Sequence, residues 1–300
     1  MSHVGGKPDA PRPASTVVLV REQEGLLEVY LLRRSAESSF FPGNYVFPGG
    51  AVGSQDRDTV LWGRHVDLSP GEIARRFGGD IEGNEVLPYG VSAIRETFEE
   101  AGVFLGENKA GAGMGFEDVA QRRVSEGLPG GWLREWMERD SLMLGLSGLA
   151  RWSHWITPKA MHKRFDTRFF MAVMPAGQGC SPDQREMTHG VWITPEQALA
   201  LNLRGEIPLS PPTLVTLHEL LPCAGLADLT EILEVRSWGK PILPVFKRLS
   251  RGAVLIEPWD PFYSEDMEIH DSDLQGTVVP VGEPFSRIGY LEGIWRPIRG

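Results

Sequence analysis

Three glutamates, Glu96, Glu99 and Glu100, have the spacing that places carboxylates on one face of a helix. Apolar residues repeat on the opposite face and predict that this helix covers residues 91–105, ending at Gly106. No lysine or arginine stands four residues after any of the three, so the helix itself does not relieve their repulsion. Such clustered carboxylates are hard oxygen ligands for Mg²⁺ or Mn²⁺ shared with substrate phosphates. The alternative is an ordinary solvated acidic face.

The segment from Arg95 to Val103 resembles the second half of the Nudix box, Gly-x5-Glu-x7-Arg-Glu-U-x-Glu-Glu-x-Gly-U, in which U is apolar. Gly50 takes the place of the first glycine, but it stands 45 residues before Arg95, where the pattern has 14. Leu87 occupies the position eight residues before Arg95, which is glutamate in the pattern. We therefore expect an interrupted box, in which Glu85 either replaces the missing acid or is an exposed loop residue.

The long interruption is similar to that of one Nudix branch, the peroxisomal coenzyme A diphosphatases. Five further segments resemble this branch, at residues 31–35, 41–50, 155–158, 164–170 and 192–195. The resemblance covers about residues 14–222, and the remainder only at 258–261. It implies an α/β fold, the Nudix α/β/α sandwich with a mixed central sheet, two helical insertions and a C-terminal extension.

The resemblance also implies an activity, the metal-dependent hydrolysis of a diphosphate linkage in a nucleoside diphosphate derivative. It assigns Mg²⁺ or Mn²⁺ to the three glutamates and the Gly50 carbonyl, with Glu186 and Glu96 as competing general bases. Arg95 precedes Glu99 by four residues and is expected to fix that carboxylate, leaving Glu96 and Glu100 free. Substrate contacts are expected from Arg34, Phe47, Gly49 and Arg164. At least one of Arg33 and Arg34 must point away from the site, because adjacent strand residues point in opposite directions, and Arg34 is the one expected to contact phosphate.

Coenzyme A or acyl-coenzyme A is the substrate that this branch implies. ADP-ribose, NADH and dinucleoside polyphosphates are the alternatives, and a catalytically silent nucleotide-binding module is another. A pantetheine arm would need an apolar channel, and the second insertion offers residues that either line it or simply pack its helices. These residues are Phe116, Leu128, Trp132, Trp136 and Met137. His162 is a further candidate for the cleft, although a single histidine is more often structural.

The composition limits the partners. The chain has 300 residues, 41% of them hydrophobic, with a formal net charge of −10, which disfavours binding to nucleic acid or an anionic membrane. Cys180 and Cys223 make no disulfide framework, and no apolar run reaches the ~20 residues of a membrane span. We expect a soluble, cytoplasmic protein that acts on a small molecule, with a homodimer left open.

Local patterns predict the elements that position these groups. Residues 1–13 read as a flexible tail, 14–222 as the Nudix domain and 223–300 as an extension packed on it, with insertions at about 51–88 and 107–149. Inside the first insertion, Ser69, Pro70 and Glu72 form a capping-box pattern that Gly78 ends. Strand patterns cover 15–20, 26–32, 151–156, 168–174 and 190–193, and helix patterns cover 116–126, 132–139 and 212–221, with another opening at Pro195. The glycine-rich segment 111–115 reads as a hinge.

Overall fold

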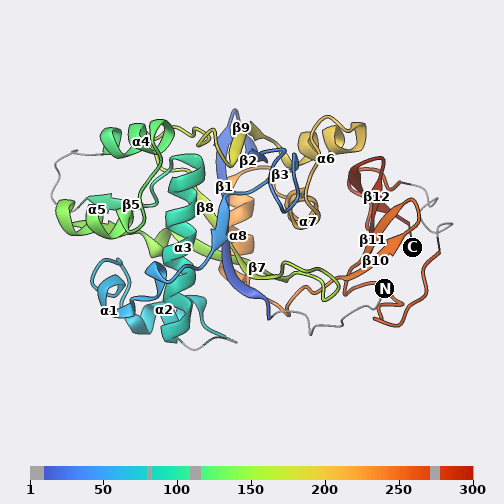
Figure 1. Ribbon diagram of the computed structural model, residues 1–300, viewed down its shortest axis with the longest axis horizontal. Coiled ribbons are helices and arrows are strands. Elements are labelled where there is room, and N and C mark those ends of the chain that lie inside the picture. Colours follow the sequence, from blue (N-terminus) through green and yellow to red (C-terminus); the bar gives the residue numbers. More distant parts are fainter. Residues whose placement is uncertain (1–9, 80, 82, 109–115, 271–277, 300) are drawn as a thin grey trace, which may run out of the picture.

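The computed structural model describes residues 10–79, 81, 83–108, 116–270 and 278–299. At its centre lies a seven-stranded sheet of order β3-β2-β1-β8-β7, in which β4 also pairs with β1 and β9 with β2 (Figure 1). The sheet is mixed, because β1 and β8 run parallel while the other pairs are antiparallel. Its strands are β1 (Arg12–Gln23), β2 (Leu26–Arg34), β3 (Tyr45–Val46), β4 (Gly49–Ala51), β7 (Leu149–Ile156), β8 (Phe165–Val173) and β9 (Met187–Ile193).

Helices cover both faces of this sheet. On β1, Val17 and Leu19 pack into one apolar cluster, while Val18 and Val20 pack into another, because successive strand residues point to opposite faces. The first cluster holds helix α3 (Gly83–Ala101) and the second holds α6 (Pro195–Arg204) and α7 (Pro211–Leu220). The fold is therefore the expected α/β/α sandwich.

The glutamate-bearing helix α3 begins earlier and ends earlier than the predicted 91–105. Its start was hidden because Pro88, which suggests a boundary, lies inside the helix, near its N-terminal end. It ends at Ala101 because Gly102 adopts a left-handed φ of 73°, which residues with a Cβ rarely take. The segment Gly106–Asn108, expected to end the helix, is strand β5.

Both insertions contain helices that pack on the α3 side of the sheet. The first contains a 3₁₀ turn η1 (Gln55–Arg57), α1 (Thr59–Trp62) and α2 (Pro70–Phe77), whose predicted capping box is present. The second contains α4 (Phe116–Ser125), α5 (Trp132–Asp140) and the strand pair of β5 with β6 (Leu142–Leu144). Trp62 and Phe77 are only 1% exposed, so the first insertion is part of the core. The predicted hinge at 111–115 lies outside the described residues.

The C-terminal part forms α8 (Leu226–Val235) and a second, antiparallel sheet of order β10-β11-β12-β13. Its strands are β10 (Val245–Leu249), β11 (Gly252–Ile256), β12 (Arg287–Leu291) and β13 (Ile294–Ile298). Leu255 and Ile288 of this sheet pack in the same apolar cluster as α6 and α7, so the two sheets share a core.

Strand β1 starts at Arg12, so residues 12 and 13, expected in the flexible tail, pair with β8 instead. The tail prediction failed there because Pro13 interrupts the apolar pattern, and the pairing of Arg12 with Phe165 is not visible in local sequence. Within the described part of the chain, no helix is long and apolar enough to cross a membrane.

Candidate active site

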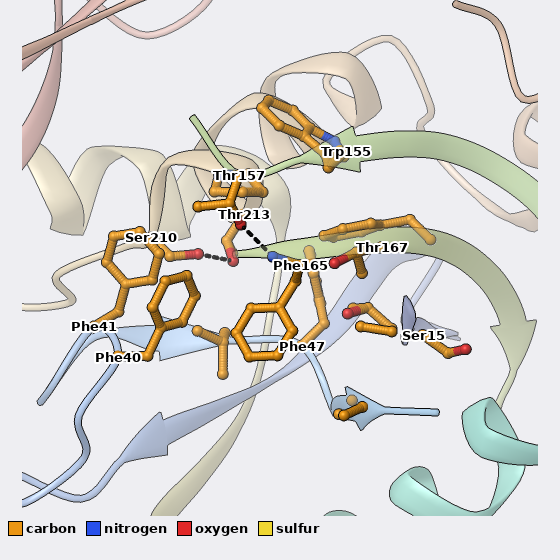
Figure 2. A pocket seen from close by; sticks show the side chains of 18 of the residues that line it. Ser15, Phe40, Phe41, Phe47, Trp155, Thr157, Phe165, Thr167, Ser210 and Thr213 are labelled. Carbon is orange, nitrogen blue, oxygen red and sulfur yellow. Dashed lines mark hydrogen bonds between the residues drawn. The ribbon is translucent and has the colours of Figure 1, made fainter. Parts of the chain in front are cut away.

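A cavity of about 460 Å³ brings together residues from β1, β2, β4, α3, β7, β8 and the C-terminal sheet. Eight residues expected in the site from sequence line it, namely Arg34, Phe47, Gly49, Gly50, Glu96, Glu99, Glu100 and Glu186. Aromatic side chains form much of the remaining wall, as Figure 2 shows for Phe40, Phe41 and Phe165. The cavity therefore has an acidic end at α3 and an aromatic end.

Strand β4 presses its two glycines against α3. A Cβ on Gly50 would lie 2.5 Å from the carboxylate oxygen Oε1 of Glu96, so any other residue there would displace this carboxylate. The Gly49 N–H donates a hydrogen bond of 2.8 Å to Glu100 Oε2. The pairing of Ser15 with Gly50 holds this strand in place, and a Cβ on Gly49 would lie 2.3 Å from the Ser15 carbonyl oxygen. The two halves of the interrupted box therefore meet in the folded chain.

Arg95 connects the carboxylates with the first insertion. Its guanidinium donates to both oxygens of Asp56, at 2.8 and 2.9 Å, and to Glu99 Oε2 at 2.8 Å. It also lies 2.7 Å from Glu96 Oε1. The expectation that Glu96 and Glu100 stay free is therefore wrong, since Arg95 holds the first and the Gly49 N–H holds the second. Although burial acts to lower the pKa of Arg95, these acidic partners raise it above its ordinary value, so the guanidinium stays charged.

Asp56 is the site residue that sequence reasoning missed. It is fully buried, and five residues separate it from Gly50, which is the spacing of the first acid of the box. Counting forward from Gly50 would have found it, whereas counting back from Arg95 leads to Leu87, which is buried in the core. Glu85 is exposed in the first turn of α3, about 16 Å along the helix from Glu96, and does not line the cavity.

The second insertion holds Glu99 from the other side. The indole Nε1 of Trp132, on α5, donates to Glu99 Oε1 at 2.5 Å. Arg123, on α4, donates to the Glu99 carbonyl oxygen at 3.0 Å, and its side chain fills the space beside Gly102 where a Cβ would lie 2.8 Å from Nη2. Both insertions therefore fix the orientation of the glutamates.

The surroundings of Glu96 and Glu100 disfavour the charged forms of both carboxylates. Burial raises the pKa of Glu96 to about 7, with Glu99 adding to the rise and Arg95 opposing it. Burial and the charge of Glu96 raise the pKa of Glu100 well above its usual range, against the hydrogen bond from Gly49. A nearby cation would favour the charged forms.

The donor set fits a divalent cation, because hard carboxylate oxygens from α3 reach one wall of the cavity and Gly50 leaves its backbone uncovered there. Within the described ranges, no three acidic, histidine or cysteine side chains already lie close enough to form a metal cluster. Arg95, Trp132 and the Gly49 N–H each donate to one of the carboxylates in this structure, so a bound ion would compete with these contacts.

Some of the other predicted residues line the cavity and others do not. Arg34 lines the cavity with its guanidinium held by Ser38 Oγ at 2.9 and 3.0 Å, whereas Arg33 is exposed and does not line it. Arg164, expected to contact substrate, is 9% exposed, donates to the Thr157 carbonyl oxygen and lies behind the wall. His162 is exposed and outside the lining.

The second insertion does not supply the apolar walls. Trp132, Trp136 and Met137 are at most 5% exposed in the core beneath α3, and Leu128 packs against the same core. The two tryptophans pack on the ring of Phe98, with ring centres 5.0 Å apart for Trp132 and 5.3 Å apart for Trp136. The side chain of Phe116 lies outside the described part. Composition alone suggested these residues as walls, and packing in the core keeps Leu128, Trp132, Trp136 and Met137 out of the cavity lining.

A mixed sheet between helical layers, with a Gly-Gly strand held against a glutamate-bearing helix, is the architecture of a Nudix hydrolase. A solved Nudix hydrolase from Alicyclobacillus acidocaldarius matches it with a TM-score of 0.61 and 27% identity, covering 78% of this chain and all of that one. The NUDT19 Nudix domain matches residues 9–220, so the chain belongs to that family of Nudix hydrolases.

Curated relatives with similar sequences point to the same family. The acyl-coenzyme A diphosphatase NUDT19 of Gallus gallus is 29% identical over 282 residues, which is 80% of this chain and 73% of the relative. The protein of the same name from Homo sapiens is 28% identical over 304 residues, covering 86% and 79% of the two chains. Nudix hydrolases generally depend on a divalent metal, in agreement with the carboxylate-rich wall.

Proposed function

We propose that this protein hydrolyses the diphosphate linkage of coenzyme A or an acyl-coenzyme A, in a reaction that depends on Mg²⁺ or Mn²⁺. The observation that carries the proposal is the cavity itself, in which the box glutamates and Gly50 share one wall with Arg34 and lead into an aromatic region. The family relatives named as acyl-coenzyme A diphosphatases support the choice of substrate.

The residues have distinct roles in this proposal. Glu96, Glu99, Glu100 and the Gly50 carbonyl hold the divalent ion, which neutralises phosphate charge and activates a water when bound. Arg34 contacts a phosphate oxygen from β2, since it reaches the same wall. Phe47 and Gly49 contact the substrate beside the ion, and Arg95 positions the glutamates.

Two carboxylates compete for the role of general base. Glu186 lines the cavity from the loop before β9, and its backbone is held by the bond from the Ser35 N–H to the Glu186 carbonyl oxygen. Glu96 is nearer to the glycine strand. Glu186→Gln distinguishes them, because it lowers turnover about 10²-fold or more if Glu186 is the base and leaves turnover nearly unchanged if Glu96 is.

The substrate is tested by incubating the protein separately with coenzyme A, an acyl-coenzyme A, ADP-ribose, NADH and a diadenosine polyphosphate, each with Mg²⁺ or Mn²⁺. The expected products are 4′-phosphopantetheine or its acyl form and adenosine 3′,5′-bisphosphate. In ¹⁸O-labelled water, mass spectrometry of both products shows which phosphorus is attacked. Intact coenzyme A under conditions that consume ADP-ribose or a dinucleotide would overturn the substrate assignment, and activity that survives a chelator would overturn the role of the metal.

A further inference from the structure

Two basic side chains line the aromatic end of the cavity, away from the glutamates. Arg12 is the first residue of β1, where it pairs with Phe165 of β8, and its N–H donates to the Arg164 carbonyl oxygen. Lys163 precedes these β8 residues in the chain, and both Arg12 and Lys163 belong to the cavity wall. The parallel pairing of β1 with β8 therefore brings two cations to one end of the cavity.

Neither cation is neutralised by the protein within the described residues. Lys163 Nζ lies 3.3 Å from the Ser39 hydroxyl and 5.6 Å from the centre of the Phe165 ring, and neither it nor Arg12 has a carboxylate partner there. By contrast, Lys159, only four residues earlier, pairs with Glu265 and does not line the cavity. Both side chains are exposed, so the protein leaves their charges open to an anionic group of a ligand in the cavity.

The acidic end and the basic residues are separated along β1. Ser15 pairs with Gly50 at the acidic end, and Arg12 lies three residues before it, about 10 Å along the strand. Flat aromatic rings stand at the same end as the two cations, and the ring centres of Phe40 and Phe165 are 5.4 Å apart (Figure 2). A nucleoside stacked on one of these rings would direct its 5′-diphosphate toward the glutamates and keep a further group on its ribose beside the two cations.

We propose that Arg12 and Lys163 form a subsite for a second phosphoryl group, carried on the ribose of the nucleotide half of the substrate. The proposal rests on the proposed function for the placement of the diphosphate at the glutamates. It assigns recognition of a ribose phosphate to a part of the cavity that hydrolysis of the diphosphate does not itself use.

Binding tests the subsite without any hydrolysis. Calorimetry would compare adenosine 3′,5′-bisphosphate with AMP, which lacks the 3′-phosphate, on the wild-type protein and on Arg12→Gln, Lys163→Met and the control Lys159→Met. We expect the bisphosphate to bind the wild type about tenfold or more tightly than AMP, the usual effect of a charge-assisted contact. Each subsite variant should lose most of this preference, with AMP affinity and the melting temperature unchanged, whereas the control should keep it.

Kinetics provides a second readout with coenzyme A and dephospho-coenzyme A. In the two subsite variants, KM for coenzyme A should rise about tenfold with kcat nearly constant, and the constants for dephospho-coenzyme A should not move. Equal affinities of the wild type for AMP and the bisphosphate, or equal losses on both ligands of a pair, would overturn the subsite. A protein that prefers the bisphosphate but leaves coenzyme A intact would retain the subsite and reject the proposed substrate instead.

Discussion

Arg95 is a buried cation whose side chain is only 6% exposed and contacts three carboxylates, those of Asp56, Glu96 and Glu99. Such a group is stable only while its partners remain ionised and in place, because an unpaired charge in this environment is costly. The geometry of the carboxylate wall thus depends on Asp56, which lies outside α3.

The first prediction concerns Asp56→Asn. It should lower the free energy of unfolding by about 3–5 kcal/mol, because Arg95 loses its charged bidentate partner while remaining buried. Turnover should fall roughly 10–100-fold, since Arg95 would no longer fix Glu96 and Glu99. Urea unfolding and steady-state kinetics measure the two effects.

Glu85→Gln is the control for this prediction, because Glu85 is the other acid offered for the interrupted box and is exposed. It should change neither quantity. A larger effect from Glu85→Gln than from Asp56→Asn would reject the assignment of Asp56.

The second prediction concerns Glu99→Gln and Glu100→Gln. Each should reduce turnover by about 10²-fold or more, because a neutral amide is a poor ligand for a hard cation. Stability without metal should stay equal or increase in Glu100→Gln, since Glu100 is 5% exposed and its charge is repelled by Glu96. Unchanged hydrolysis in both variants would contradict the metal site.

At the scale of elements, α4 and α5 fix the C-terminal end of α3 by contacts with Glu99. Trp132 packs on Phe98 with ring centres 5.0 Å apart and donates its indole N–H to the Glu99 carboxylate. Helix α5 therefore combines core packing with orientation of a site residue.

The third prediction separates these two contributions with Trp132→Phe. The ring contact should persist while the hydrogen bond to Glu99 is lost, so turnover should fall roughly tenfold and stability by about 1–2 kcal/mol. Trp136→Phe is the matched control, because its ring packs on the same Phe98 at 5.3 Å and its exchange leaves the Trp132 bond intact. Equal losses of turnover in both variants would show that packing alone matters.

Many of the helices and strands are predictable from local sequence. The α2 capping box, the β1–β2 hairpin and helices α4 and α5 all follow from periodicity and turn residues. The start of α3 does not, since tertiary packing carries the helix through Pro88. Local patterns also miss the direction in which α5 points its tryptophans, because the stacking partner Phe98 comes from another helix. Asp56 differs, because its spacing from Gly50 marks it in the sequence, whereas its bond to Arg95 appears only in the folded chain.

At the scale of the whole molecule, the C-terminal sheet contributes Leu255 to the cavity and holds a buried acid, Glu257, directly after β11. Glu257 is fully buried, and within the described residues neither carboxylate oxygen has a hydrogen-bond partner. Burial raises its pKa from 4.5 to about 8. Sequence alone gave no role to this region because short strands between prolines carry little periodicity, and their function depends on a distant core.

The fourth prediction is a pH dependence of stability that Glu257 causes. Between about pH 4.5 and about pH 8, the folded chain keeps this proton and the unfolded chain loses it, so stability falls as pH rises through that window. The slope from this one group approaches about 1.4 kcal/mol per pH unit. The free energy of unfolding, measured with urea between pH 5 and pH 8, should therefore fall less steeply with pH in Glu257→Gln than in the wild type. Parallel curves for the two proteins would contradict it.

The box is split between β4 and α3, and its halves meet only in the folded chain, where Asp56 of the first insertion bonds to Arg95. An unfolded chain therefore lacks the assembled coordination set, and divalent ions should bind the native state almost selectively. By mass action, an ion that binds only the folded state raises the free energy of unfolding. At a free Mg²⁺ or Mn²⁺ concentration of 100 times Kd, this increase should be about 2.7 kcal/mol. Titrating the melting temperature with metal would thus report ion affinity even where no substrate is turned over.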